Sequence, residues 1–257
     1  MHAKRSLHLD RDQCQWVMVL PPRSAYPETM RGLFLLSLLA LAACGRPLTP
    51  GEMAFTAALQ GDGPHISAAR LSDGLATAAP RTIPAPPRLT CQQRIYPPPS
   101  GDTIRVGTQA MVIFNDIYLR PEVYLDDLMS QYPAKVYLPD AMLLAHEMVH
   151  VWQWQNRDQT QYHPLKAAFE HFGGRDPYLF DPETTAPFQS FAYEQQGAIM
   201  EEYVCCKALA PNADRTRRLH DMLAEVFDLP PLEAPLAAEI YLPWRGVEIE
   251  GICDGPA

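Results

Sequence analysis

Residues 141–156 read Ala-Met-Leu-Leu-Ala-His-Glu-Met-Val-His-Val-Trp-Gln-Trp-Gln-Asn, a run that contains no proline or glycine. Most of its residues favour helices. Asp140 stands directly before it, at the position expected for an N-cap. Apolar residues recur every three to four positions, which predicts an amphipathic helix whose packed face is formed by Met142, Ala145, Val149 and Trp152.

The opposite face of this helix carries His146 and His150, which are four residues apart. Two residues at this spacing lie about one turn apart on one side of a helix, so both imidazoles can reach the same cation. Glu147 lies beside them and can take a proton from a water activated by that cation. The pattern predicts a metal-activated hydrolase, and an ordinary solvated or core histidine pair is the alternative.

The pentad His146-Glu147-Met148-Val149-His150 resembles that of the zincin metallopeptidases, specifically the gluzincin type. In that type a downstream helix supplies a glutamate as the third zinc ligand, and residues 193–203 look like this helix. Glu194 is the first choice of ligand, and Glu201 and Glu202 remain alternatives. The resemblance implies bound zinc (Zn2+), Glu147 as general base, and an α+β, zincin-like fold, mainly helical with a small sheet before the active-site helix.

Residues 108–203 also resemble uncharacterised bacterial envelope proteins that combine a His-Glu-x-x-His-Val-Trp-Gln helix with a Glu-Gln-Gln helix. The matching positions here are 146–153 and 194–196. Gluzincins often carry an acid four residues after the ligand glutamate, but this chain has Ala198 there. That difference leaves open which residue supports the metal ligands.

The N-terminal region predicts export. Residues 30–43 combine Arg31, an apolar run and the ending Leu-Ala-Ala before Cys44, which resembles a bacterial lipoprotein signal peptide. The resemblance implies that Cys44 is lipidated and anchors the protein to a membrane of the envelope, facing the periplasm. Gly45 after it resembles the signal for the outer rather than the inner membrane. Residues 1–29 fit no such scheme, so we expect translation to begin at Met30.

Composition agrees with an envelope location. The chain has 21 Lys and Arg against 30 Asp and Glu, a formal net charge of −9, so we expect no nucleic-acid partner. Beyond Cys14 and Cys44, four cysteines remain, an even number compatible with disulfides in an oxidising compartment. Cys91 could pair with Cys253, or either could pair with one of the adjacent Cys205 and Cys206. Thiolate binding of zinc is a weaker alternative, because no Cys-x-x-Cys pair is present.

Residues 44–257 are expected to form a single domain, with a proline-rich, extended segment at 78–100. Helices are expected at 49–59, 186–208 and 214–227, and strands at 104–106, 111–114 and 135–138. The last strand directly precedes the pentad helix. Its exposed edge could hold an extended peptide by strand addition.

Four aromatic residues between the two site helices are candidates to stabilise an oxyanion, although a structural role is the favoured interpretation of each: Tyr162, His163, His171 and Tyr178. The predicted function is zinc-dependent hydrolysis of a peptide bond in a peptide or protein substrate. A cell-wall stem-peptide amidase and a non-enzymatic metal-binding envelope protein are the alternatives.

Overall fold

The computed structural model describes residues 45–75, 80–171 and 176–254. The chain divides into two compact units, 1–45 and 46–257, and all helices and strands of the described residues belong to the second. The predicted upstream extension, the signal peptide and Cys44 lie outside the described residues.

The described chain is a mixed α+β structure with eight α-helices and eight short strands. The helices are α2 (Pro50–Gln60), α3 (Pro64–Ala68), α4 (Cys91–Arg94), α5 (Leu138–Gln155), α6 (Arg157–Thr160), α7 (Pro164–Glu170), α8 (Tyr193–Leu209) and α9 (Asp214–Leu223). The strands are β1 (Arg46–Pro47), β2 (Arg70–Asp73), β3 (Arg81–Pro84), β4 (Thr103–Val106), β5 (Ala110–Ile113), β6 (Asp116–Leu119), β7 (Lys135–Tyr137) and β8 (Glu239–Tyr241).

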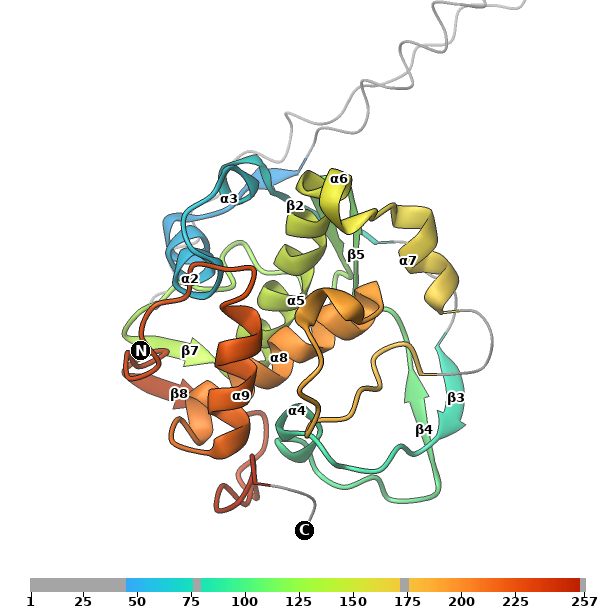
Figure 1. Cartoon of the computed structure of the whole chain (residues 1–257). Coiled ribbons are helices and arrows are strands. Elements are labelled where there is room, and N and C mark those ends of the chain that lie inside the picture. Colours follow the sequence, from blue (N-terminus) through green and yellow to red (C-terminus); the bar gives the residue numbers. More distant parts are fainter. Residues whose placement is uncertain (1–44, 76–79, 172–175, 255–257) are drawn as a thin grey trace, which may run out of the picture. The chain divides into compact units, whose positions relative to one another are not determined.

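Three small sheets surround a central pair of helices. The largest has the order β1-β2-β6-β5, in which β2 and β6 are parallel and the other pairs antiparallel. The other two are the antiparallel pair β3-β4 and the parallel pair β7-β8. Helices α5 and α8 pack against each other in the middle, with α2 and α3 on one side and the β3-β4 pair on another (Figure 1).

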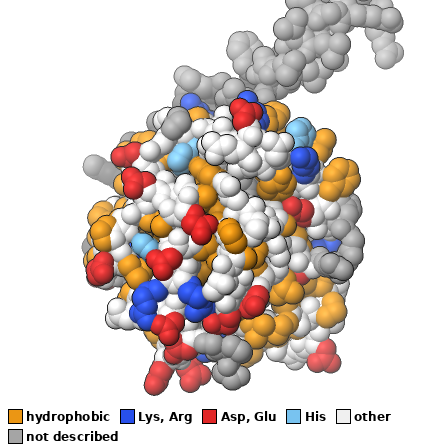
Figure 2. All heavy atoms as spheres, viewed as in Figure 1, with side chains coloured by type: hydrophobic (Ala, Val, Ile, Leu, Met, Phe, Trp, Pro, Cys, Tyr) orange, Lys and Arg blue, Asp and Glu red, His pale blue; other side chains and the backbone are white. Residues whose placement is uncertain are grey.

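Because helices and sheet surround it, α5 is buried on almost every face, including the face that carries the histidines. Its apolar residues join one core with those of α2 and α8. Its almost completely buried members include Phe55, Leu59, Leu138, Leu144, Met148, Ile199 and Tyr203. On the face drawn in Figure 2, acidic side chains are interspersed among hydrophobic ones, and the Lys and Arg side chains form no broad continuous patch.

Most expected elements are present, with shifted boundaries. Helix α2 begins after a capping box formed by Thr49 and Glu52, and the expected strands appear as β4, β5 and β7. The N-cap prediction for Asp140 is wrong, because α5 begins three residues before the predicted helix and Tyr137 is its N-cap. Proline at the second helical position is compatible with this earlier start, since its missing N–H would have no helical partner there.

Two further expectations need correction. The helix expected at 186–208 begins only at Tyr193, because residues before it form the short 3-10 helix η4 (Phe188–Ser190) after Pro187. The expected helix at 214–227 ends at Leu223. The proline-rich segment at 78–100 is not extended throughout. It contains the strand β3, but its later part forms the short helix α4.

A buried histidine in α3 predicts sensitivity to acid. His65 lies within 3.1 Å of the Gln60 Oε1 atom, and burial lowers the pKa of His65 to about 4. The unfolded chain, with an ordinary histidine pKa near 6.5, therefore binds more protons between pH 6.5 and 4. The contribution of neutral His65 to the free energy of unfolding is therefore complete above pH 6.5 and is lost as pH falls from 6.5 towards 4.

We expect the free energy of unfolding in urea to fall by about 1 to 2 kcal/mol more between pH 7.5 and pH 5 for the wild type than for His65→Gln. The variant cannot titrate at this position, so it isolates the contribution of His65. Equal losses in the two proteins would contradict this assignment.

Candidate metal centre

Three donor atoms from two helices converge at one point. The Nε2 atoms of His146 and His150, both on α5, lie 3.2 Å apart. The Oε2 atom of Glu194, in the first turn of α8, lies 3.4 Å from each of them. All three side chains are buried, and together they form a group that could hold a metal ion.

The close packing of the two helices at this point depends on Gly197. A Cβ atom on Gly197 would lie only 2.5 to 2.7 Å from three ring atoms of His146. Glycine inside a helix costs roughly 1 kcal/mol relative to alanine, so its presence between Glu194 and Glu201 is itself informative. The sequence analysis missed this role, although a glycine within the ligand helix was the available signal.

Gln153 orients His150 and connects the two helices. Its Oε1 atom lies 2.8 Å from His150 Nδ1. Its amide group donates to the Tyr193 carbonyl oxygen at 3.2 Å and to Gln196 Oε1 at 2.9 Å. Because the Gln153 oxygen can only accept, it favours a proton on Nδ1 and leaves Nε2 free to bind a metal. Sequence reasoning gave Gln153 no role beyond its place in the resemblance.

Glu201 lies on the other side of His146. Its Oε1 atom is 2.9 Å from His146 Nδ1, a charge contact between the carboxylate and the imidazole. The contact again favours a proton on Nδ1 and a free Nε2. Glu201 therefore contacts one of the three donor side chains, and its own carboxylate is not in the group of three.

Glu202, the other alternative ligand, lies outside the site. Its carboxylate accepts from the backbone N–H of Cys91 at 3.0 Å and of Gln92 at 3.2 Å, and from Arg215 Nη1 at 2.9 Å. Adjacent residues on a helix point about 100° apart, so Glu201 and Glu202 face different neighbours. Glu202 is a structural residue that holds α4 and α9 against α8.

Helix α7 fixes the first turn of α8. The Glu170 carboxylate accepts from the backbone N–H groups of Tyr193 and Glu194, both at 3.0 Å. His171 Nε2 lies 3.2 Å from Glu194 Oε1, the oxygen that does not face the other histidines. Both contacts restrict the position of the Glu194 carboxylate. The role of Glu170 was not predicted.

The electrostatics of the site favour a positive charge at its centre. Burial alone lowers the pKa of His146, but the carboxylates of Glu201 and Glu194 raise it well above its usual range. Burial alone raises the pKa of Glu194, but His150, His146 and His171 hold it well below its usual range. Two Nε2 lone pairs facing each other beside a carboxylate repel one another unless a cation or proton lies among them.

Glu147 is buried next to the three donors, and burial raises the pKa of its carboxyl group. It lines a cavity of about 590 Å³ together with His146, His171, Tyr178 and Glu201. Residues 106–110, from the end of β4 to the start of β5, also line this cavity. A small molecule or an extended chain in this cavity can therefore contact Glu147 and His146.

The strand whose edge was expected to hold an extended peptide, β7, does not line this cavity. Strand β7 pairs with β8, and its residues do not line the cavity that contains Glu147. The residues that do so, 106–110, lead into β5, the end strand of the four-stranded sheet. Chain proximity to the pentad favoured β7, whereas tertiary packing brought a more distant segment to the site.

The four aromatic candidates separate into two groups. His171 and Tyr178 line the cavity, with ring centroids 5.6 Å apart, and can reach a bound molecule. Tyr162 is buried and stacks on His150 with ring centroids 5.9 Å apart. The His163 ring accepts from the Leu165 N–H at 3.2 Å and caps α7. Tyr162 and His163 therefore have structural roles.

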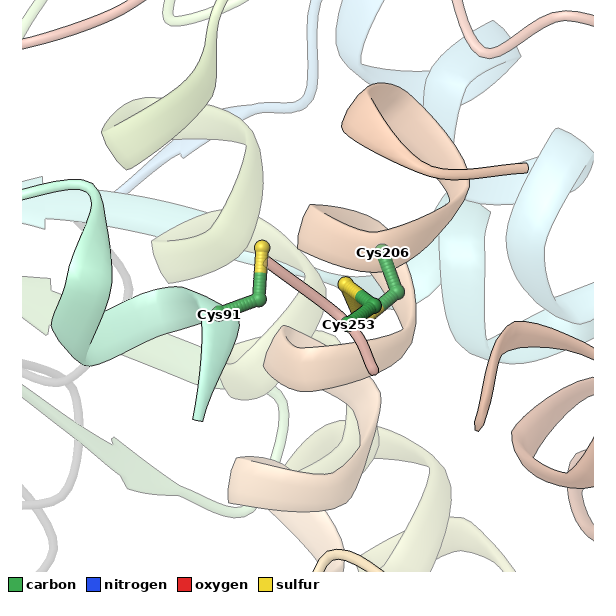
Figure 3. Close-up of side chains that lie close together, drawn as sticks. All are labelled: Cys91, Cys206 and Cys253. Atoms are coloured by element: carbon green, nitrogen blue, oxygen red, sulfur yellow. A yellow bond between two sulfur atoms is a disulfide. The ribbon is translucent and has the colours of Figure 1, made fainter. Parts of the chain in front are cut away.

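The four cysteines of the described residues form two disulfides, Cys91–Cys205 and Cys206–Cys253. The alternative Cys91–Cys253 pair is wrong. Because adjacent residues point in different directions from a helix, Cys205 reaches α4 and Cys206 reaches the C-terminal segment. Figure 3 shows Cys206 on its helix beside Cys253. Although Cys91, Cys206 and Cys253 lie close enough to share a metal, bonded sulfurs offer no thiolate to hold one.

Comparison with family models, with curated proteins and with solved structures found no match to this chain. In the part of the chain that the structure describes, no helix is both long and apolar enough to span a bilayer. The site itself defines a class: a protein with a buried two-histidine, one-glutamate group on two packed helices, which could hold a metal ion.

Proposed function

We propose that this protein is a zinc-dependent peptide-bond hydrolase with a zincin-like, gluzincin-type site. The observation that carries the proposal is the triangle of donor atoms with sides of 3.2, 3.4 and 3.4 Å. Ligands about 2.0 Å from a tetrahedral zinc lie about 3.3 Å apart, so the triangle matches three corners of such a tetrahedron. Two imidazoles and one carboxylate, with an open fourth corner, are a donor set of catalytic zinc.

The residues around the triangle fit this chemistry. Zinc, when bound, supplies a Lewis acid that polarises a carbonyl and lowers the pKa of a coordinated water towards neutrality. In the proposed mechanism Glu147 accepts the proton of the attacking water and returns it to the departing amine. His171 and Tyr178 lie in the same cavity, where they can donate hydrogen bonds to the carbonyl oxygen as it gains negative charge.

Replacing Glu147 by glutamine tests the proposal. Glutamine has the same size but cannot accept the proton, so we expect hydrolysis of an unstructured protein substrate to fall by at least about a hundredfold. We expect the zinc content, measured by elemental analysis, to stay at one per chain, because Glu147 is not among the donor atoms. Loss of metal from this variant would contradict the separate roles of donors and base.

The choice of substrate separates the alternatives. Cleavage of cell-wall stem peptides without cleavage of protein would favour the amidase. If the zinc-loaded wild type cleaves neither class, the site serves metal-dependent binding rather than hydrolysis.

We propose further that the protein is an envelope lipoprotein anchored through Cys44. Two disulfides in the described residues support an oxidising compartment. Stable anchoring depends on acyl chains attached to the cysteine, so we expect Cys44→Ser to move the protein from the membrane fraction to the soluble fraction of the envelope. The measurement is immunoblotting of separated fractions with and without the substitution. An unchanged membrane fraction would argue against lipidation at Cys44.

A further inference from the structure

A second cavity, of about 650 Å³, adjoins the one that contains Glu147. We call it the side groove. The two cavities share the lining residues Gln109, Leu143, Tyr178 and Glu201. A chain that lies across Glu147 can therefore send a side chain into the side groove.

The walls of the side groove are mainly apolar. The proline-rich segment forms one wall, and the β4 strand and the first turns of α5 form others, with side chains that include Tyr96, Pro97, Pro99, Ile104, Val123 and Met142. The Cys91–Cys205 disulfide ties the α4 part of this wall to α8, the helix that carries Glu194. The wall is therefore held at a fixed place relative to the metal centre.

One carboxylate in this apolar groove lacks a partner. Asp140, in the first turn of α5, is partly buried, and no described residue forms an ion pair or a side-chain hydrogen bond with it. Burial raises the pKa of Asp140 to about 6, which shows the energetic cost of leaving this charge uncompensated.

The cationic side chains nearby are engaged elsewhere. The Arg88 guanidinium donates to the carbonyl oxygens of Gln93 and Arg94, at 3.3 and 3.0 Å, and to that of Tyr96. Lys135 pairs with Glu239 at 3.3 Å. The remaining acids of the side groove are Asp176 and Glu201, so acidic side chains outnumber basic ones along its lining.

A mainly apolar groove whose lining includes an unpaired carboxylate complements a long aliphatic stem with a terminal cation. Asp140 precedes His146 by six residues, which is about 9 Å along the helix axis. An extended peptide advances about 3.3 Å per residue. A lysine within about two residues of the bond at the metal centre can therefore place its ammonium group beside Asp140.

We propose that the side groove binds a lysine side chain of an extended peptide substrate and that Asp140 determines this preference. The proposal rests on the proposed function and deepens it by naming the substrate class. Asp140 acts as a specificity residue: it pairs with the ammonium group, while the groove walls bury the stem. The Tyr96 and Tyr178 rings, which also line the groove, can add cation–π attraction.

Binding to the full-length, zinc-loaded Glu147→Gln protein tests this inference without turnover. The probes are fluorescein-labelled decapeptides of alanine, serine and glutamine with one central variable residue: lysine, norleucine or glutamate. Norleucine keeps the aliphatic stem and lacks the charge. We expect the lysine peptide to bind about three- to tenfold more tightly than the norleucine peptide, with the glutamate peptide weakest.

Adding Asp140→Asn should reduce the lysine-to-norleucine ratio to about one, while zinc content stays unchanged. Asp126→Asn, an exposed acid that does not line the side groove, is the matched control and should keep the ratio. Equal affinities for the three peptides, or no binding of any of them, would overturn the proposal. Hydrolysis of the norleucine peptide by the wild type is measured separately, so a failed preference is distinguished from a failed enzyme.

Discussion

Replacing Gly197 by alanine should remove the metal from the protein. The added Cβ would overlap the His146 ring at 2.5 to 2.7 Å, so the ring must turn away or the two helices must separate. Either movement takes Nε2 of His146 out of the donor triangle. Because zinc needs all three protein ligands, we expect its affinity to fall on the order of a thousandfold, measured by competition with a chelator of known affinity.

The helix content of the Gly197→Ala variant distinguishes loss of the metal from loss of the fold. Alanine is the better helix former by roughly 1 kcal/mol, so the apo form of the variant should keep its helix content, measured by circular dichroism. Gly101→Ala is the matched control, since its Cβ would meet nothing within 4 Å. Wild-type zinc affinity in the Gly197 variant would show that the metal centre is not where the donor triangle places it.

Replacing Arg215 by methionine should destabilise the protein without emptying the site. Arg215 is almost fully buried, and its guanidinium contacts Glu202, Glu183 and the carbonyl oxygens of Leu89 and Asp254. Without it the buried Glu202 carboxylate keeps only two backbone N–H donors. Removing one partner of a buried pair costs about 3 to 5 kcal/mol, measured by urea unfolding.

Two further variants test whether the expected loss of stability comes from breaking the buried Arg215–Glu202 pair. The double variant Arg215→Met with Glu202→Gln removes both charges, so it should lose less stability than the sum of the single variants. Arg217→Met, on the same helix, breaks an exposed pair with Asp214 and should change stability by less than about 1 kcal/mol. Loss of zinc from folded Glu202→Gln would return Glu202 to the candidate ligands.

The local elements of the site were accessible from the sequence because they depend on residues close together in the chain. The spacing of His146 and His150 determines that they share a helix face, and the helix-favouring composition around them determines that the helix forms. The predicted start of that helix was wrong for a local reason. Asp140 is a good N-cap residue and so favoured a start at 141, whereas Pro139 is well suited to the first turn of a helix that begins earlier. The pairing of the four cysteines was left open because spacing does not decide it.

The sequence by itself determined that His146 and His150 share one face of a helix, that Glu147 lies beside them, and that a second helix follows, since each depends on local spacing and propensity. Only the tertiary structure brought the Glu194 carboxylate, rather than that of Glu201 or Glu202, into one group with His146 and His150, because residues on one helix face different neighbours according to how that helix packs. The same packing decided that Gly197 allows the close approach of α8 to His146, that residues 106–110 face Glu147, and that Asp140 lies in an apolar groove. These relations join segments far apart in the chain, and local propensity carries no information about their contacts.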